Sequence, residues 1–572
     1  MRIIDQESEI RNQESEIRNQ QFMLQKKMVE RHRNLLLCVI FLFLIQACSS
    51  KRSVPLDSQV EDLKPALQSV TADDLLQHIR VLASDEFEGR APGTRGERLT
   101  VEYLTEQFKK LGLRPGNPDG TYVQNVPLAA IKCIPAVSFT AGRRKLSLAY
   151  PADYVAVSRC SKQKIEIGNS DVVFVGYGII APEYGWDDYK GVDVQGKTLI
   201  ILTNDPPVPD PADPSKLDNS MFEGKAMTYY GRWTYKYETA AQQKAAAAIL
   251  VHETQSVGYP YGVLVSSLEQ ESLILEKTEE GENNIPVESW IRLSTTKRLF
   301  SFAGFDFLRI KKAALKRSFR PVSLGVKANF LIKNAIRKIN SQNVVAKLEG
   351  SDPMLREQCV IYSAHWDHLG KSDKLKGDKI YNGALDNASG TAGLLEIAKA
   401  YTKLHILPKR TTLFLAFTGE EKGLLGSRFY TENPLYPLAK TVADINQDGM
   451  NPWGCTRDIA VIGLNSSPLH NIAREVARSQ GRRIEPDLQP EKGFFYRSDH
   501  YEFARRGIPT LFTDAGIDMI GKPAEYGLRK RGEYTRRNYH NVTDEVKPDW
   551  DLSGAVEDLK FLFLVGYKAS GL

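Results

Sequence analysis

Residues 359–368 read CVIYSAHWDH, in which the run CVIYSA at 359–364 is followed by histidine and aspartate. A continuous apolar run of this length is typical of a strand that is buried on both faces of a parallel sheet. Similar runs recur further along the chain: TTLFLAFT (411–418), VADINQ (442–447) and IPTLFT (508–513). Helical patterns alternate with these runs at 389–404, 423–432, 468–480 and 498–506. This alternation predicts an α/β fold in which helices sandwich a mixed, mostly parallel sheet.

Carboxylate and imidazole side chains follow the ends of the expected strands. The group consists of His365, Asp367, His368, Glu420, Glu421 and Asp448, with Asp386 and the pair Tyr539-His540 on loops. In a parallel sheet the ligands gather beyond the carboxyl ends of the strands. Anionic groups that converge there without a basic partner repel one another unless a cation neutralises them. The pattern therefore predicts two metal ions held by carboxylate and imidazole groups, without thiolate.

The order of these groups resembles the co-catalytic zinc aminopeptidases of peptidase family M28. The motifs are H-x-D at 365–367, G-x-x-D-N-x-S-G at 383–390, E-E at 420–421, an aspartate after a strand at 448, and Y-H-x-x-x-D at 539–544. The segment 78–115 is also similar to the N-terminal segment of that family. The resemblance implies the zinc aminopeptidase fold and removal of N-terminal residues from peptides with a free N-terminus.

The resemblance also implies a ligand set. It assigns one Zn²⁺ ion to His365, Asp386 and Asp448, and a second to Asp386, Glu421 and His540, with Asp386 bridging. Co²⁺ or Mn²⁺ could replace zinc at ligands of this kind. A cis peptide bond between Asp386 and Asn387 is expected from the same resemblance.

Three further residues receive catalytic or supporting roles. Asp367 would accept a hydrogen bond from the second ring nitrogen of His365. Adjacent residues that leave a strand point in different directions, so Glu421 can bind metal while Glu420 faces the substrate as general base. Tyr539 would donate a hydrogen bond to the developing oxyanion. The attacking group would be a hydroxide that bridges the two metal ions.

The domain organisation follows from changes in the sequence pattern. Residues 71–165 and 331–572 are expected to form the catalytic domain, the first of them opening with two amphipathic helices. Residues 166–330 consist of short β-rich runs broken by Gly and Pro. This segment is similar to a protease-associated (PA) domain inserted into the catalytic domain. One hypothesis for the insert is a lid-like entrance that favours short peptides.

The first residues have the pattern of a secretory signal. Residues 7–20 repeat the heptad ESEIRNQ twice, which is too short for a coiled coil and indicates an upstream extension. From Met28, a charged stretch precedes an apolar run at 35–45 that is too short to cross a bilayer. We therefore expect residues 1–47 to be a signal region whose true start is Met28.

The end of this region resembles a bacterial lipobox. Ile45-Gln-Ala-Cys48 is followed by small residues, so Cys48 is expected to carry the lipid and residues 48–70 to be a tether. The expected location is the bacterial cell envelope, facing the periplasm or the exterior. The lipid anchor at Cys48 would be the sole contact with the membrane.

Composition excludes several function classes. The 572 residues carry a formal charge of only +6 and no long Lys/Arg run, so we expect no nucleic-acid partner. The six cysteines are too few and too scattered for a disulfide scaffold, and no CxxC occurs, but pairing among Cys133, Cys160, Cys359 and Cys455 stays open. The oligomeric state also stays open.

Alternatives remain at the level of single residues and of function. His500 competes as a histidine ligand, but Ser498-Asp499-His500 has the pattern of a helix start and resembles a motif near the family's substrate pocket. His368 and His252 are interpreted as ordinary residues. The two alternative functions are a glutaminyl-cyclase-like enzyme with one zinc ion and a non-catalytic, receptor-like relative.

Overall fold

The computed structural model describes residues 56–268, 271–276 and 284–571. Residues 63–572 form one compact unit, which contains all the elements discussed below apart from the start of α2 (Leu56–Ser69). The expected signal region and Cys48 lie outside the described residues. Within the described part of the chain, every helix is too short or too polar to cross a bilayer.

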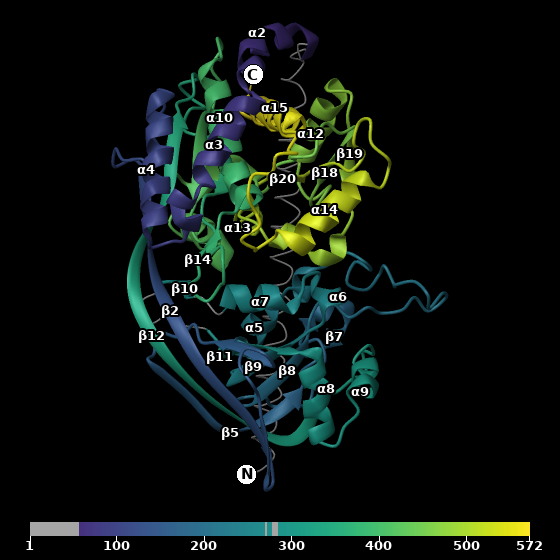
Figure 1. The fold of residues 1–572 in the computed structure, drawn as a ribbon. Coiled ribbons are helices and arrows are strands. Elements are labelled where there is room, and N and C mark those ends of the chain that lie inside the picture. Colours follow the sequence, from purple (N-terminus) through teal and green to yellow (C-terminus); the bar gives the residue numbers. More distant parts are fainter. Residues whose placement is uncertain (1–55, 269–270, 277–283, 572) are drawn as a thin grey trace, which may run out of the picture. The chain divides into compact units, whose positions relative to one another are not determined.

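The sheet predicted around residue 359 is present (Figure 1). Its predicted strands are β13 (Cys359–His365), β16 (Thr411–Phe417), β17 (Thr441–Gln447) and β20 (Thr510–Asp514). β13 pairs in parallel with both β16 and β17, and β17 pairs in parallel with β20. The sheet is mixed because β12 (Val322–Leu348) and β18 (Asp458–Val461) join it antiparallel, and β19 (Arg483–Pro486) extends it. The predicted fold class is therefore confirmed.

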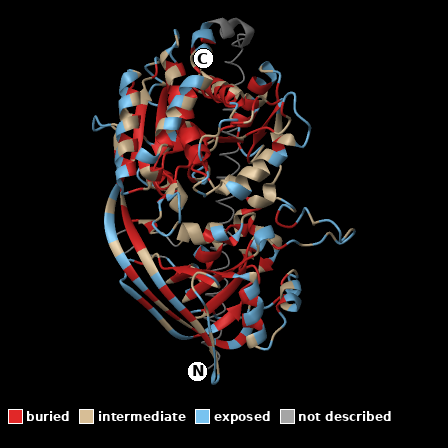
Figure 2. Ribbon diagram, viewed as in Figure 1, coloured by how far each residue is buried: buried red, intermediate tan, exposed pale blue. Residues whose placement is uncertain are grey.

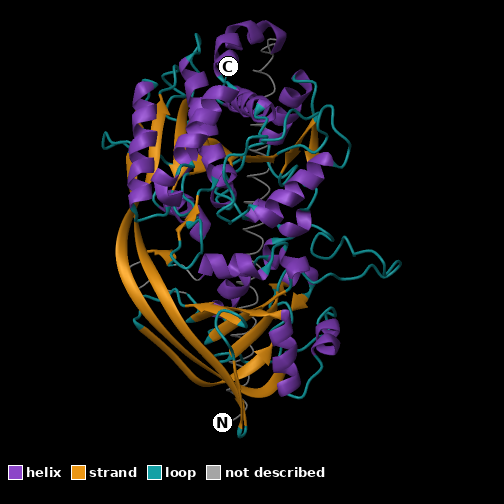
Figure 3. Ribbon diagram, viewed as in Figure 1, coloured by secondary structure: helices purple, strands orange, loops and turns teal. Residues whose placement is uncertain are grey.

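Helices cover both faces of this sheet (Figure 3). One face carries α3 (Ala72–Leu82), α4 (Arg95–Lys110), α10 (Ser389–Thr402), α12 (Leu469–Ser479) and α15 (Ser553–Ala569). The other carries α11 (Leu425–Glu432) and α13 (His500–Ala504). Alternate residues of β13 pack on opposite faces, Val360 and Tyr362 on the first and Cys359 and Ile361 on the second. This two-sided burial explains why the strand sequence is continuously apolar. Figure 2 shows the central strands of the catalytic sheet as buried.

The expected tether differs from the structure. Residues 56–69, which were assigned to the tether, form helix α2. Leu63, Ala66 and Val70 are buried in the main core. Their spacing places them on one face of a helix, and burial of that face accounts for the helical conformation.

A second group of strands surrounds its own core. It contains β3 (Arg144–Ser147), β4 (Tyr154–Val157), β5 (Lys164–Phe174), β8 (Thr198–Leu202), β9 (Ala247–His252), β10 (Ser272–Leu275) and β11 (Val287–Arg292). Its helices are α5 (Trp233–Gln242), α6 (Thr254–Val257), α7 (Tyr261–Leu268), α8 (Leu293–Phe302) and α9 (Phe307–Ala313). We call this part, residues 123–343, the inserted lobe.

Two long strands connect the inserted lobe to the catalytic sheet. β2 (Val123–Ala141) pairs antiparallel with β12 over its whole length, and the C-terminal end of β12 pairs with β16. Phe139, Tyr154 and Ala156 belong to the core of the inserted lobe. The packing boundary therefore lies earlier than the expected residue 166, because a strand that runs through both lobes leaves no break in the sequence pattern.

The four cysteines of the described segments are all free thiols. Cys359 is buried within β13 and Cys160 is buried in the inserted lobe. The pairing that the sequence left open does not occur among them.

Candidate metal centre

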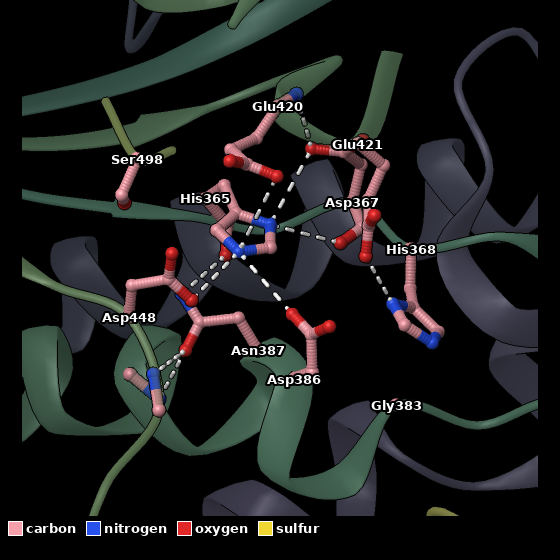
Figure 4. A network of polar contacts seen from close by, with 12 residues as sticks. His365, Asp367, His368, Gly383, Asp386, Asn387, Glu420, Glu421, Asp448 and Ser498 are labelled. Atoms are coloured by element: carbon pink, nitrogen blue, oxygen red, sulfur yellow. Dashed lines mark hydrogen bonds and ion pairs between the residues drawn. The ribbon is translucent and has the colours of Figure 1, made fainter. Parts of the chain in front are cut away.

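The side chains expected to bind metal lie at the carboxyl ends of neighbouring parallel strands. His365 is the last residue of β13, Glu420 begins the turn after β16, and Asp448 directly follows β17. His365 is in register with Phe417 at the end of β16, and Ala364 with Gln447 at the end of β17. The pairing of the strands thus places three distant parts of the sequence within one site (Figure 4).

The first cluster is centred on His365. Its Nε2 atom lies 3.2 Å from Oδ1 of Asp448, 3.5 Å from Oδ1 of Asp386 and 3.9 Å from Oε2 of Glu420. Three ligand atoms, one from each of His365, Glu420 and Asp448, lie within 4.8 Å of one another. A single cation placed among them would be within reach of one imidazole and several carboxylates.

The second cluster is centred on Glu421. Its Oε2 lies 2.9 Å from Nε2 of His540, and its Oε1 lies 2.6 Å from Nδ1 of His368. Nε2 of His540 also lies 3.3 Å from Oδ2 of Asp386. Asp386 therefore presents Oδ1 to His365 and Oδ2 to His540, and it lies between the two clusters as the expected bridging residue would.

The interpretation of His368 as an ordinary residue is wrong. Its ligand atom lies within 4.8 Å of one atom each of Asp386 and Glu421, and the side chain is fully buried. The sequence contained a signal, because His368 follows His365 by three residues in the same strand-end loop. Its contact with Glu421, however, depends on a second strand.

The two adjacent glutamates have opposite electrostatic environments. Burial raises the pKa of Glu420 well above its usual range, and the charges of Asp448 and Glu421 add to this, against the opposing effect of His365. Burial also disfavours the charged form of Glu421, but His540 and His368 outweigh it and hold the pKa well below the usual range. Glu421 is thus the stronger anion, as a metal ligand should be, while Glu420 binds a proton readily.

The histidines respond to the same carboxylates. Burial by itself lowers the pKa of His540, but Glu421 and Asp386 raise it to about 10. Glu420 and Asp448 raise the pKa of His365 well above its usual range against the same effect of burial. Carboxylates that stabilise an imidazolium this strongly would also stabilise a divalent cation in its place, so the donor set fits two metal ions.

Hydrogen bonds hold the loop that carries Asp386 on both sides of this residue. The predicted cis peptide bond between Asp386 and Asn387 is present. The Asn387 side-chain amide donates to the carbonyl oxygen of Gln447 (3.0 Å), and its oxygen accepts from the backbone N–H of Gly449 (3.0 Å). The carboxylate of Asp544 accepts from the N–H groups of Leu385 (3.2 Å) and Asp386 (3.1 Å). These bonds fix the position of the Asp386 carboxylate.

Asp367 lies beside His365, but its main-chain oxygen is closer to the histidine than its carboxylate, which was expected to accept the hydrogen bond. Nδ1 of His365 lies 3.2 Å from the main-chain oxygen of Asp367 and 3.7 Å from its carboxylate. The carboxylate accepts the backbone N–H of Glu420 at 3.0 Å. Asp367 therefore contacts both the histidine and the turn that carries the two glutamates.

Arg90 is a supporting residue that the sequence gave no reason to single out. It is 1% exposed, and its guanidinium donates to four carbonyl oxygens. The acceptors are those of Leu82 (2.6 Å), Trp366 (2.9 Å), Asn382 (2.6 Å) and Gly383 (2.9 Å). Arg90 thus joins the end of α3 to the two loops that carry His365 and Asp386.

The motif Ser498-Asp499-His500 lies beside the two clusters and contributes to the wall of a cavity. His500 is fully buried against the rings of Phe495 and Phe512, and burial lowers its pKa to about 3. It belongs to neither cluster found among the described residues. Ser498 accepts a hydrogen bond from the Asn446 amide (2.6 Å) and lines a cavity beside the clusters, in agreement with the expected rim position.

Two cavities of about 190 Å³ each meet at the clusters. Both are lined by Glu420, Glu421, Tyr539 and His540. The ring of Tyr539 stacks on that of His540, with ring centroids 4.0 Å apart. Burial raises the pKa of Tyr539 well above its usual range, so its phenol keeps its proton.

Comparison with known proteins agrees with this geometry. Residues 343–564 match the sequence model of Peptidase family M28. A probable zinc metalloprotease of Pyrenophora tritici-repentis is 36% identical over 233 residues, which cover 35% of this chain and 50% of that protein. Aminopeptidase Y of Saccharomyces cerevisiae is 28% identical over 229 residues, covering 39% of this chain and 38% of that protein. The chain thus spans half or less of the length of these curated relatives.

A solved structure shares the fold over most of the chain. The aminopeptidase from Aneurinibacillus sp. strain AM-1 has a TM-score of 0.51 and 18% sequence identity, and the match covers 89% of this chain and 96% of that one. At this identity the likeness concerns the arrangement of the elements.

Proposed function

We propose that this chain, whose residues 343–564 match peptidase family M28, is a di-zinc metallopeptidase that removes N-terminal residues from peptides. The observation that carries the proposal is the position of Asp386. Its two carboxylate oxygens face two separate clusters, each with a histidine and a second carboxylate. This arrangement suits a pair of metal ions that share one ligand.

The metal ions would be held as the sequence predicted. His365, Asp386 and Asp448 would bind one zinc, and Asp386, Glu421 and His540 the other, with His368 in contact with Glu421. When bound, the two ions would supply Lewis acidity that lowers the pKa of water and polarises the peptide carbonyl.

Glu420 is the proposed general base. Its side chain lines both cavities beside the proposed metal sites, and an ionised carboxylate at this position can take a proton from water. It would then pass that proton to the departing amine. The backbone N–H of Glu420, bonded to Asp367, fixes the turn from which the side chain extends.

Tyr539 is the proposed donor to the oxyanion. Its phenol remains protonated and lies beside His540 at the meeting point of the cavities. A hydrogen bond from a buried phenol to a developing negative charge stabilises the transition state more than the ground state.

The free N-terminus of a peptide has a natural place in the cavity that Asp448 lines. Its lining has more carboxylates than basic side chains, so we call it the acidic cavity, and Met450 and Phe512 add apolar surface. The free amino group of a peptide could reach the metal centre from this cavity, and an apolar first side chain would pack against the apolar part.

Two further proposals concern the rest of the chain. The similarity of the inserted segment to a PA domain supports its assignment as an accessory domain. The apolar run at 35–45 and Cys48 support export and lipid anchoring in a bacterial envelope, facing the periplasm or the exterior.

Metal analysis combined with a substrate panel tests the activity. We expect about two zinc ions per chain and hydrolysis of aminoacyl-anilides but not of their N-acetylated forms. One zinc ion per chain would favour the cyclase-like alternative, and a chain without zinc or hydrolysis would favour the receptor-like one. Equal turnover of free and N-acetylated substrates would reject aminopeptidase activity.

A further inference from the structure

The second cavity differs in charge from the acidic one. It extends from Glu421 and His540 into the inserted lobe, where Arg232, Tyr259 and Trp290 line it. Arg497, from the catalytic part of the chain, lines both cavities. Both lobes therefore contribute an arginine to the space beside the metal clusters.

Arg232 is a buried cation that has no carboxylate partner among the described residues. It directly precedes helix α5 and is 8% exposed. Its Nε atom is buried without a hydrogen-bond partner, and no carboxylate of the described residues lies within ion-pair distance. Its guanidinium carbon lies 5.7 Å from the centre of the Trp233 ring. An arginine in this environment loses hydration without gaining an ion pair.

Arg497 is similarly unpaired. One of its terminal nitrogens donates to the carbonyl of Val257 (3.2 Å), while Nε is buried without a partner. The guanidinium lies 5.6 Å from the ring centres of both Tyr259 and Phe494. Burial and the charge of Arg497 together lower the pKa of Arg232 to about 10. Both arginines line the second cavity and a smaller one, so two positive charges face the same space without a carboxylate of the described residues between them.

The contrast with neighbouring arginines is informative. Arg159 lines the same cavity but is paired with Glu288 (2.9 Å). Arg531 lines the acidic cavity and is paired with Asp514 (3.1 Å). The absence of a carboxylate at Arg232 and Arg497, within the described part of the protein, is therefore specific to that end of the cavity. A bound anion would relieve both the desolvation and the repulsion.

We propose that Arg232 and Arg497 bind the C-terminal carboxylate of a short peptide whose first peptide bond lies at the metal clusters. This inference rests on the proposed function, and it specifies the substrate as dipeptides and tripeptides with a free C-terminus. The ammonium end would occupy the acidic cavity, and the leaving amino acid would extend toward the arginines. Two guanidinium groups supply the forked donors that a carboxylate accepts.

Paired substrates test the proposal. For the wild-type enzyme, we expect kcat/KM for leucylglycine to exceed that for leucylglycinamide by roughly 10–100-fold, the range for hydrogen bonds to charged groups. Arg232→Gln and Arg497→Gln should each bring this ratio close to one, mainly through KM, and Arg232→Lys should restore part of it. Arg309→Gln, an exposed arginine of the inserted lobe, is the matched control and should preserve the ratio.

Binding measurements separate this proposal from the proposed function. Calorimetry on zinc-loaded Glu420→Gln should show tighter binding of leucylglycine than of its amide, and adding Arg232→Gln should remove the difference. If no peptide or anilide is hydrolysed, the proposed function fails, but calorimetry still decides whether the carboxylate is recognised. Equal binding of acid and amide by the Arg232-containing protein would overturn the proposal.

The carboxylate could also come from an acidic second side chain. Leucylglutamic acid α-amide (Leu-Glu-NH₂) carries the side-chain carboxylate without a C-terminal one. If the enzyme prefers this amide to leucylglycine and Arg232→Gln loses the preference, the C-terminal assignment is overturned. The arginines would then bind the carboxylate of a side chain. If kcat/KM for this amide equals that for leucylglycinamide, the proposal is supported.

Discussion

Nδ1 of His368 lies 2.6 Å from Oε1 of Glu421, on the side of the carboxylate opposite to His540. Glu421 is thus held between two imidazoles, and both lower its pKa. His368 contacts Oε1 of Glu421 and so sets the orientation of the carboxylate, while Oε2 faces His540. The contact would let His368 orient Glu421, which is a metal ligand in the proposed function.

His368→Ala should weaken zinc binding at the cluster of Glu421 and His540 by about 10–100-fold, the usual effect of removing a group that orients a ligand. Zinc retained after dialysis against graded chelator concentrations measures this. His405→Gln, at an exposed histidine, is the control and should retain wild-type zinc. Unchanged zinc affinity in His368→Ala would contradict the orienting role.

Glu420 and Glu421 should respond differently to substitution. Glu420→Gln keeps the shape of the side chain but cannot take a proton, so we expect near-normal zinc content and a fall in kcat of about 10²–10⁴-fold. Glu421→Ala should lose most of one zinc ion together with activity, and excess zinc should restore part of both by mass action. The opposite pattern would show that base and ligand are exchanged.

Arg90→Met should destabilise the fold by at least about 3 kcal/mol, because four buried carbonyl oxygens lose their donor. Urea unfolding of the zinc-free protein measures this change. Arg98→Met provides the control, since Arg98 is exposed on α4 and makes only a 4.0 Å ion pair with Glu102. A loss no larger than that of Arg98→Met would contradict the role given to Arg90.

His470 should make stability depend on pH. Its Nδ1 accepts the N–H of Asn465 (2.9 Å), and burial together with the charge of Arg474 lowers its pKa to about 4. Between pH 6.5 and 4 the unfolded chain therefore binds a proton that the folded protein does not, so stability falls as the pH falls through this range. The contribution of His470 amounts to about 1–2 kcal/mol between pH 7 and 5.

His470→Asn tests this dependence, because asparagine keeps the acceptor but does not titrate. Urea unfolding at pH 7 and pH 5 should show a smaller loss of stability for the variant than for the wild type. His405→Gln should lose as much stability as the wild type, because that histidine is exposed. Equal losses in the wild type and His470→Asn would reject the linkage.

The strands that carry the candidate site were predictable from the sequence, but other elements of the same domain were not. β13 and β16 begin and end within one residue of the predicted ranges, because continuous apolar runs bounded by polar residues leave few alternatives. Helix α15 was not predicted, since it is buried on nearly all sides and lacks a one-sided apolar period. The inserted lobe begins earlier than predicted, because β2 and β12 run through both lobes.

The sequence by itself determined which residues could bind metal and in what order they follow the strands. Strand ends and their polar residues are covalent neighbours, so the local pattern placed His365, Glu421 and Asp448 among the candidate metal-binding residues, and the resemblance to family M28 implied which of the candidates are ligands. Only the tertiary structure decided that His368 contacts Glu421 and that Arg232 and Arg497 share a cavity. These residues lie on different loops and lobes, and their proximity depends on how the chain packs, which local composition does not encode.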